Sequence, residues 1–313
     1  MLTNRVKTKL ESIRDLPTIP IVISEVLAAI DNPKSSAASL AKIIEKDQAL
    51  TARVLRIANS PFYGYTRQIS TIDLAIVIMG FNTLKEIVLS IVIQRFFSKV
   101  NTKLFNIRDF WQYGLFCGST ARLLSRKLGY KIAGEAFVAG LMHDIGIIII
   151  AEYFTPKFKE IIKFANENNV SLIDAEQAIM ECTHAEIGAW IADKWNLPDK
   201  MVTAIRNHHI NYAFFAKNND FDAYSESDTL IRDIDQPLTA IVSLAEWFAD
   251  LLGLSKWMGS LIKPDYYLST EVFGELNSED ILDPESSLFA LKAELMEEFE
   301  KANIFIELQV SHA

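Results

Sequence analysis

Residues Ala136–Ala151 read AFVAGLMHDIGIIIIA, and this stretch decides how the rest of the 313-residue chain is interpreted. Apolar residues surround the predicted helix on every side, which is typical of a helix buried in the core of a domain. Its centre nevertheless carries His143 and Asp144. A buried carboxylate without a partner costs several kcal/mol, so we expect a metal ion, an arginine or the N-terminus of a neighbouring helix beside Asp144.

Nearly every segment outward from this stretch has a helical pattern. No run of residues alternates between apolar and polar side chains, so no strand is predicted beyond a stray short one. Asp47 is predicted as an N-cap, Gly80 as a helix stop and Asn82 as the cap of the next helix. The fold class is therefore predicted as all-α. The expected helices include residues 19–30, 36–46, 49–60, 72–79, 82–97, 109–128, 134–154, 156–168, 171–180, 237–252, 255–262 and 284–302.

The composition limits the class of protein. With 50% hydrophobic residues, 12 glycines, 9 prolines and 2 cysteines, the chain is neither collagen-like, nor disulfide-rich, nor disordered. No run of 18 unbroken apolar residues occurs, and the N-terminus has no signal-peptide pattern. Cys117 and Cys182 fit a reducing compartment. We therefore expect a cytoplasmic protein without a membrane segment.

Charge divides the chain near residue 217. The net charge is −9, and residues 217–313 carry 6 basic and 20 acidic residues, against 25 and 20 in residues 1–216. The acidic total argues against nucleic acid as a partner. Residues 216–236 are polar and have no helical period, so they are predicted to form a loop or linker.

Three further histidines follow the His-Asp pair. Thr183–Glu186 has the form of a capping box, so His184 is predicted in the first turn of a helix, where the helix dipole favours a neutral imidazole. His208 and His209 are predicted late in a helix, three and four residues after Ile205. Neutral imidazoles are good metal ligands, but histidines satisfied in a core or capping the end of a helix fit the same spacing. Spacing alone leaves these alternatives open.

Five sequence words occur in an order that is typical of one family. They are LPTIP at residues 16–20, DQALTARVLRIANS at 47–60, AIVIMGFNTL at 75–84, AFVAGLMHDIG at 136–146 and HAEIGAWIADKWNLP at 184–198. These words resemble the HDOD subfamily of the HD superfamily of metal-dependent phosphohydrolases. The resemblance covers about residues 14–215 and implies a multi-helical HD-like fold with an N-terminal helical bundle.

The resemblance also implies a metal site. The divalent ion that the resemblance implies is Fe, Mn, Zn or Ni. In an active enzyme, Asp144 would be the candidate catalytic residue. The implied ligands are His143, Asp144, His184, His208 and His209.

Two positions depart from the pattern of the superfamily. Tyr113 stands where the first histidine is usual, and a phenol is a poor replacement for an imidazole in a divalent-metal site. Glu246 stands where the final aspartate is usual. It belongs to a polar stripe with Thr239, Ser243 and Asp250, which fits a solvated helix face equally well.

These observations give a predicted organisation and two candidate functions. We expect an N-terminal helical subdomain at residues 1–105, an HD-like subdomain at 106–215, an acidic linker at 216–236 and an acidic helical extension at 237–313. HDOD proteins resemble degenerate HD domains, which predicts a non-catalytic bacterial signal-transduction module. Such a module would bind a signalling protein or a nucleotide-like ligand. The alternative is a metal-dependent phosphohydrolase acting on a nucleotide or cyclic dinucleotide.

Overall fold

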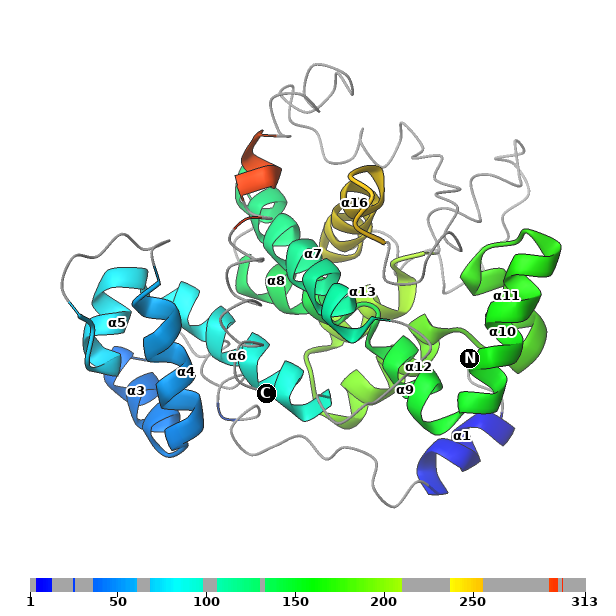
Figure 1. Ribbon diagram of the computed structural model, residues 1–313, viewed down its shortest axis with the longest axis horizontal. Coiled ribbons are helices and arrows are strands. Elements are labelled where there is room, and N and C mark those ends of the chain that lie inside the picture. Colours follow the sequence, from blue (N-terminus) through cyan, green and yellow to red (C-terminus); the bar gives the residue numbers. More distant parts are fainter. Residues whose placement is uncertain are drawn as a thin grey trace. The chain divides into compact units, whose positions relative to one another are not determined.

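The structure is a computed structural model that describes residues 4–12, 25, 36–60, 68–97, 106–129, 133–209, 237–255, 293–297 and 300. Every regular element in these residues is a helix, so the predicted all-α class is confirmed (Figure 1). Contacts divide the chain into two compact units. The smaller unit comprises Pro17–Val100 and Glu298–Ala313, and the larger comprises Met1–Leu16 and Asn101–Glu297.

The smaller unit contains four described helices that form because their ends are capped and their apolar faces meet. Ser36 closes a capping box with Ser39, and the Asp47 carboxylate accepts hydrogen bonds from the amides of Ala49 and Leu50, as predicted for an N-cap. The helices are α3 (Ala37–Glu45), α4 (Gln48–Ala58), α5 (Ile72–Met79) and α6 (Phe81–Phe97).

A sharp turn joins α5 to α6. Gly80 ends α5 with a positive φ of 84°, a conformation that a residue with a Cβ rarely adopts. Helix α6 then begins at once at Phe81. The prediction that Asn82 caps this helix is therefore wrong, because the glycine turn leaves no residues for a separate cap and places Asn82 inside the first turn.

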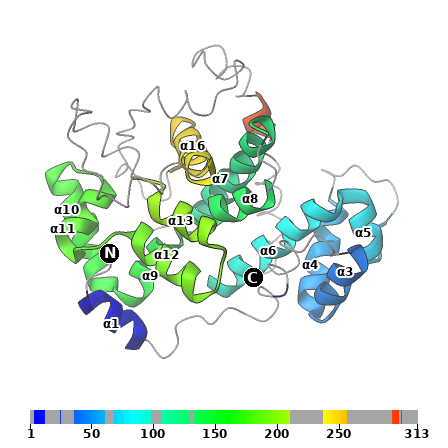
Figure 2. The ribbon, with the colours of Figure 1, turned by 180° about the vertical axis from the view of Figure 1, so that it is seen from behind.

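The larger unit is built around α7, which packs against α8 and α16. Helix α12 packs against α9 and α13, and α10 and α11 form a hairpin beside α9 (Figures 1 and 2). The described helices are α1 (Asn4–Ser12), α7 (Ile107–Lys127), α8 (Ala133–Met142), α9 (Ile145–Tyr153), α10 (Thr155–Asn168), α11 (Leu172–Met180), α12 (His184–Lys194), α13 (Asp199–Asn207) and α16 (Pro237–Leu251).

Helices α7 and α8 approach each other backbone to backbone. A Cβ added at Gly118 would lie 2.7 Å from the carbonyl oxygen of Phe137, and one at Gly140 would lie 2.8 Å from the carbonyl oxygen of Cys117. These distances are shorter than a van der Waals contact, so only glycine fits at either position. The close approach brings the end of α8 against the middle of α7.

The apolar stretch quoted above does not form one helix. Helix α8 ends at Met142 and α9 begins at Ile145, so His143 and Asp144 form a turn between two buried helices. The prediction of a continuous helix over residues 134–154 is therefore wrong. Apolar residues surround both helices, so the hydropathy pattern shows no break between them. The break is stabilised instead by side-chain and backbone contacts of the turn.

Residues 133–153 are together long and apolar enough to cross a membrane by length and composition. Within the protein, 89% of the most apolar 18-residue stretch of this segment is buried, as in the core of a domain. Three predicted segments lie wholly or almost wholly outside the described residues: the helices at 19–30 and 255–262 and the linker at 216–236. Only 293–297 and 300 of the predicted helix at 284–302 are described, and they are helical.

Candidate metal centre

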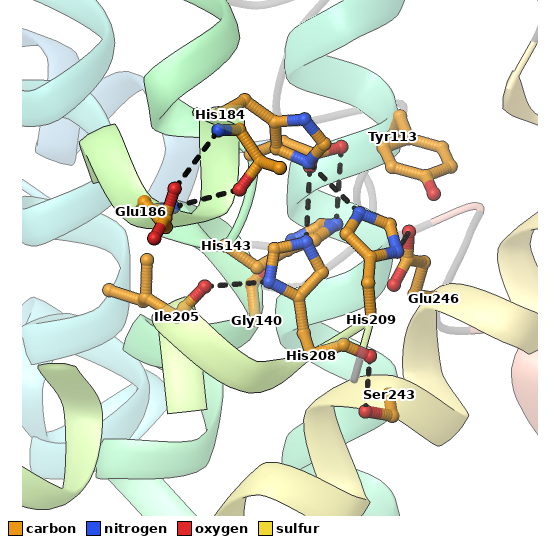
Figure 3. A network of polar contacts seen from close by, with 12 residues as sticks. Tyr113, Gly140, His143, His184, Glu186, Ile205, His208, His209, Ser243 and Glu246 are labelled. Carbon is orange, nitrogen blue, oxygen red and sulfur yellow. Dashed lines mark hydrogen bonds and ion pairs between the residues drawn. The ribbon is translucent and has the colours of Figure 1, made fainter. Parts of the chain in front are cut away.

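Polar side chains from four parts of the larger unit meet at one centre, and Figure 3 shows its four histidines and Glu246. The Asp144 Oδ2 atom lies 3.3 Å from His143 Nε2. Its Oδ1 atom lies 3.2 Å from His184 Nε2 and 3.5 Å from His208 Nε2. The structure thus brings together a carboxylate and three imidazoles that the sequence separates by up to 65 positions.

Two overlapping groups of ligating atoms share this centre. Within each group, the candidate atoms lie within 4.8 Å of one another. Asp144 and His208 belong to both groups, so the arrangement offers room for one cation or for two that share a carboxylate. The first group is Asp144, His184, His208 and His209, and the second is His143, Asp144, His208 and Glu246.

The ends of two helices orient two of the histidines. His143 Nδ1 lies 2.7 Å from the carbonyl oxygen of Gly140, and His208 Nδ1 lies 2.7 Å from that of Ile205. A carbonyl oxygen only accepts, so each Nδ1 donates and each Nε2 faces the Asp144 carboxylate. The acceptors are carbonyls in the last turns of α8 and α13, which have no intrahelical amide partner.

His208 therefore caps the end of α13 through one nitrogen and faces the centre through the other. The sequence predicts His208 and His209 late in a helix. The structure ends α13 at Asn207, so both histidines lie in the turn after it. The position is fixed further by Ser243 of α16, whose hydroxyl donates a 2.6 Å hydrogen bond to the carbonyl oxygen of His208.

His184 is the first residue of α12, as the capping box predicts. Thr183 Oγ1 accepts from the amide of Glu186, and Glu186 Oε2 accepts from the amide of Thr183. The His184 ring lies between Glu176, 2.7 Å from Nδ1, and His209, 2.9 Å from Nε2. Its Nε2 atom therefore faces the same centre as the other imidazoles.

A glycine contact places the turn at Asp144 against the start of α12. A Cβ added at Gly146 would collide with the carbonyl oxygen of His184 and would lie 2.8 Å from the amide nitrogen of Gly188. Helices α9 and α12 therefore touch through their backbones. This contact is what allows Asp144 and His184 to approach within ion-pair distance.

Three buried atoms at the centre, His143 Nε2, His208 Nε2 and Asp144 Oδ1, make no aligned hydrogen bond among the described residues and have only the ion-pair contacts given above. Their side chains are 7% exposed or less. Leaving such atoms unsatisfied costs about 1–3 kcal/mol each. A divalent cation would bind all three, so the residues present fit a metal. Imidazole-rich sites suit Zn, Fe and Ni better than Mg or Mn.

The environment favours the protonation states that a metal requires. Burial alone would raise the pKa of Asp144, but His143, His184 and His208 together hold it well below its ordinary value. Burial lowers the pKa of His208 to about 4. Burial and the neighbouring His208 lower the pKa of His209 as well. The aspartate is therefore charged and these two imidazoles are neutral at pH 7.

His184 differs from its neighbours. Burial lowers its pKa, but Glu176 and Asp144 outweigh burial and raise the pKa well above the ordinary value. The carboxylate of Glu176 thus makes His184 the most basic imidazole of the three whose pKa is shifted.

The two positions that depart from the superfamily pattern behave differently. Glu246 joins the centre, with Oε1 at 3.6 Å from His209 Nδ1. The Tyr113 ring lies 5.8 Å from the His143 ring, but its hydroxyl donates a 3.3 Å hydrogen bond to Asp250. Burial, Asp250 and Glu246 raise the pKa of Tyr113 well above 10, so the phenol keeps its proton and is a poor ligand.

The polar stripe on α16 is buried. Thr239, Ser243, Glu246 and Asp250 are each 7% exposed or less, so the solvated-face alternative does not hold. Glu176, which is fully buried on α11, was not predicted as part of the site. A signal was present, because Glu176 follows Leu172 by one helical turn on the apolar face of that helix.

Comparison with known proteins identifies the family at this point. The family model described as the HDOD domain matches residues 16–211. The chain belongs to the HDOD family. An uncharacterized protein of Treponema pallidum (strain Nichols) is 24% identical over 200 residues, which are 64% of this chain and 38% of that protein. The chain thus spans well under half the length of this curated relative.

Two solved structures have the same fold. An HDOD domain protein with unknown function from Geobacter sulfurreducens matches with a TM-score of 0.74 and 23% identity, covering 96% of this chain and 99% of that one. A "Putative signal transduction protein" from Marinobacter aquaeolei VT8 matches with a TM-score of 0.72 and 20% identity, covering 98% and 62%. At these identities the likeness shows the HDOD fold alone.

Proposed function

We propose that this HDOD protein is a non-catalytic bacterial signal-transduction module whose larger unit holds a divalent metal ion. The ion would be bound by Asp144 and His208 with His143, His184, His209 and Glu246 around them. The output would be the binding of a signalling protein or a nucleotide-like ligand. The description of the Marinobacter relative supports a signalling role, and the composition favours the cytoplasm.

The observation that carries the metal proposal is the set of three unsatisfied buried atoms. Hydrogen bonds at Nδ1 already orient His143 and His208, and their Nε2 atoms converge on the charged carboxylate of Asp144. Metal-binding histidines have this arrangement, in which one ring nitrogen donates to a fixed acceptor and the other binds the ion. A core that only needed to be stable would have apolar residues at these positions.

Two features favour a non-catalytic role. A hydrolytic metal keeps an open position for water and substrate. Here the side chains of His143, His184 and His208 are 2% exposed or less, and His209 reaches only 16%. The hydroxyl of Tyr113, beside the centre, is engaged with Asp250. Both features support an ion that stabilises the larger unit.

One observation favours the alternative of a metal-dependent phosphohydrolase. Asp144 and His208 belong to both groups of ligating atoms, and a shared carboxylate is typical of two-metal hydrolytic sites. When bound, such ions lower the pKa of a water molecule that attacks phosphorus. In this alternative, Asp144 would hold the two ions together, and His209 and Glu246 would form the more accessible side.

Elemental analysis tests the proposal. The protein is purified without a chelator or a histidine tag and compared with Asp144→Asn, which removes the charge and keeps the shape. We expect about one Zn, Fe or Ni ion per chain in the wild type and its loss in the variant. Less than about a tenth of an ion per chain in both would contradict it.

A second measurement separates the two candidate functions. The metal-loaded protein is assayed with bis-p-nitrophenyl phosphate, a general phosphodiester substrate. We expect no turnover above that of Asp144→Asn. Turnover that requires the metal and Asp144 would instead establish the phosphohydrolase.

A further inference from the structure

We infer that Glu176 is a positioning residue for the metal centre, a role that rests on the proposed metal binding. Its carboxylate holds the imidazole of His184 with Nδ1 donating to Glu176 and Nε2 facing the ion. Glu176 comes from α11, whereas the candidate ligands lie on or beside other helices. The inference adds a second layer of residues to the site.

A single oxygen of Glu176 makes both contacts with His184. Glu176 Oε2 accepts a 2.8 Å hydrogen bond from the backbone amide of His184 and lies 2.7 Å from its Nδ1. The carboxylate therefore fixes the ring relative to its own backbone. With Nδ1 bound in this way, Nε2 lies 3.2 Å from Asp144 Oδ1.

Helix capping accounts for only one of the two contacts of Glu176, the one with the backbone amide of His184. The start of α12 already has a complete capping box, formed by Thr183 and Glu186. Glu186 is half-buried, whereas Glu176 is fully buried, and a buried carboxylate is costly unless specific donors compensate it. The donors that the structure gives it both belong to His184.

The chemistry of the acceptor distinguishes His184 from the other imidazoles. His143 and His208 donate to neutral carbonyl oxygens, but His184 donates to a carboxylate. A carboxylate acceptor makes the opposite ring nitrogen a stronger electron donor, and loss of such a partner typically weakens metal binding about 10- to 100-fold. Glu176 therefore strengthens the bond from His184 to the ion.

Zinc affinity of Glu176→Gln tests the inference, with Glu186→Gln as the matched control. Both variants replace a carboxylate by an amide of the same shape at the same end of α12, but only Glu176 touches the imidazole. Competition with a chromophoric chelator gives the dissociation constants. We expect a weakening of about 10-fold or more for Glu176→Gln and of less than about twofold for Glu186→Gln. Equal effects in the two variants would overturn the inference and leave the metal proposal standing.

A measurement on the metal-free wild type keeps the inference testable even without metal binding. In ¹H–¹⁵N spectra of the imidazoles, we expect the His184 Nδ1 proton to be protected from exchange and shifted downfield by the carboxylate. Glu176→Gln should move this signal upfield, and Glu186→Gln should not. A His184 that carries its proton on Nε2 alone would overturn the inference. Failure of the wild type to bind zinc would remove the proposed function by itself.

Discussion

The two units of the protein differ in what they bury. In the described part of the smaller unit, the buried polar side chains are those of Ser60 and Ser90, and the rest of the core is apolar. The larger unit buries Asp144, Glu176 and Glu246 together with three histidines. Hydrophobic burial stabilises the first kind of core directly, whereas the second keeps charges that cost stability unless they are paired. The larger unit is therefore the part of the described chain that carries the candidate metal centre.

The largest expected effect comes from Gly146, the glycine at which α9 contacts the backbone of α12. Gly146→Ala places a methyl group against the His184 carbonyl, so we expect the larger unit to lose about 3 kcal/mol or more of its free energy of unfolding. Gly80→Ala in the smaller unit is the control, because its Cβ has open space and only the positive φ is strained, at about 1 kcal/mol. Urea denaturation measures both. Similar losses would show that backbone contact is not what shapes the metal centre.

A substitution that creates a cavity in the smaller unit should have the next largest effect. Ile44 is fully buried, so Ile44→Ala should cost the smaller unit about 3 kcal/mol. The two cysteines lie in the larger unit and are buried, and burial raises the pKa of Cys182 to about 12. Their reaction with a thiol reagent therefore reports the opening of the larger unit. We expect Ile44→Ala to leave the labelling rate and the metal content unchanged, and faster labelling would show that the two units are coupled.

Removal of the metal should affect the larger unit alone. At free zinc of about 100 times the dissociation constant, binding stabilises the folded state by about 3 kcal/mol. We therefore expect a chelator to speed cysteine labelling in the wild type. Asp144→Asn should label at one rate with and without the chelator. A chelator effect of equal size in both proteins would exclude Asp144 as a ligand.

The smallest expected effects come from removing a capping box in each of the two units. Ser36 and Thr183 each close a capping box, so Ser36→Ala and Thr183→Ala should each cost about 1 kcal/mol. Only Thr183→Ala should also weaken zinc binding, because its box fixes the first residue of α12, His184. Calorimetric titration with zinc makes the comparison. Unchanged zinc affinity in Thr183→Ala would mean that Glu176 holds His184 without help from the cap.

Much of this architecture could be predicted because it depends on contacts between neighbours in the chain. The bounds of α5, the N-cap at Asp47 and the capping box before His184 involve residues no more than a few positions apart. The break at His143 and Asp144 could not be predicted in this way. The turn depends on the contact of Gly146 with His184, a residue 38 positions further along the chain.

The sequence by itself determined an all-helical fold, its family and five of the residues that the structure brings together, namely His143, Asp144, His184, His208 and His209. Helical periodicity and caps are local, and the five family words occur in order along the chain. Only the tertiary structure decided which nitrogen of His143, His184 and His208 faces Asp144. It also decided that Glu176 holds His184 and that Tyr113 donates to Asp250. The Tyr113–Asp250 contact joins residues 137 positions apart. Such contacts depend on how α7, α12 and α16 pack, and no local pattern of residues records that packing.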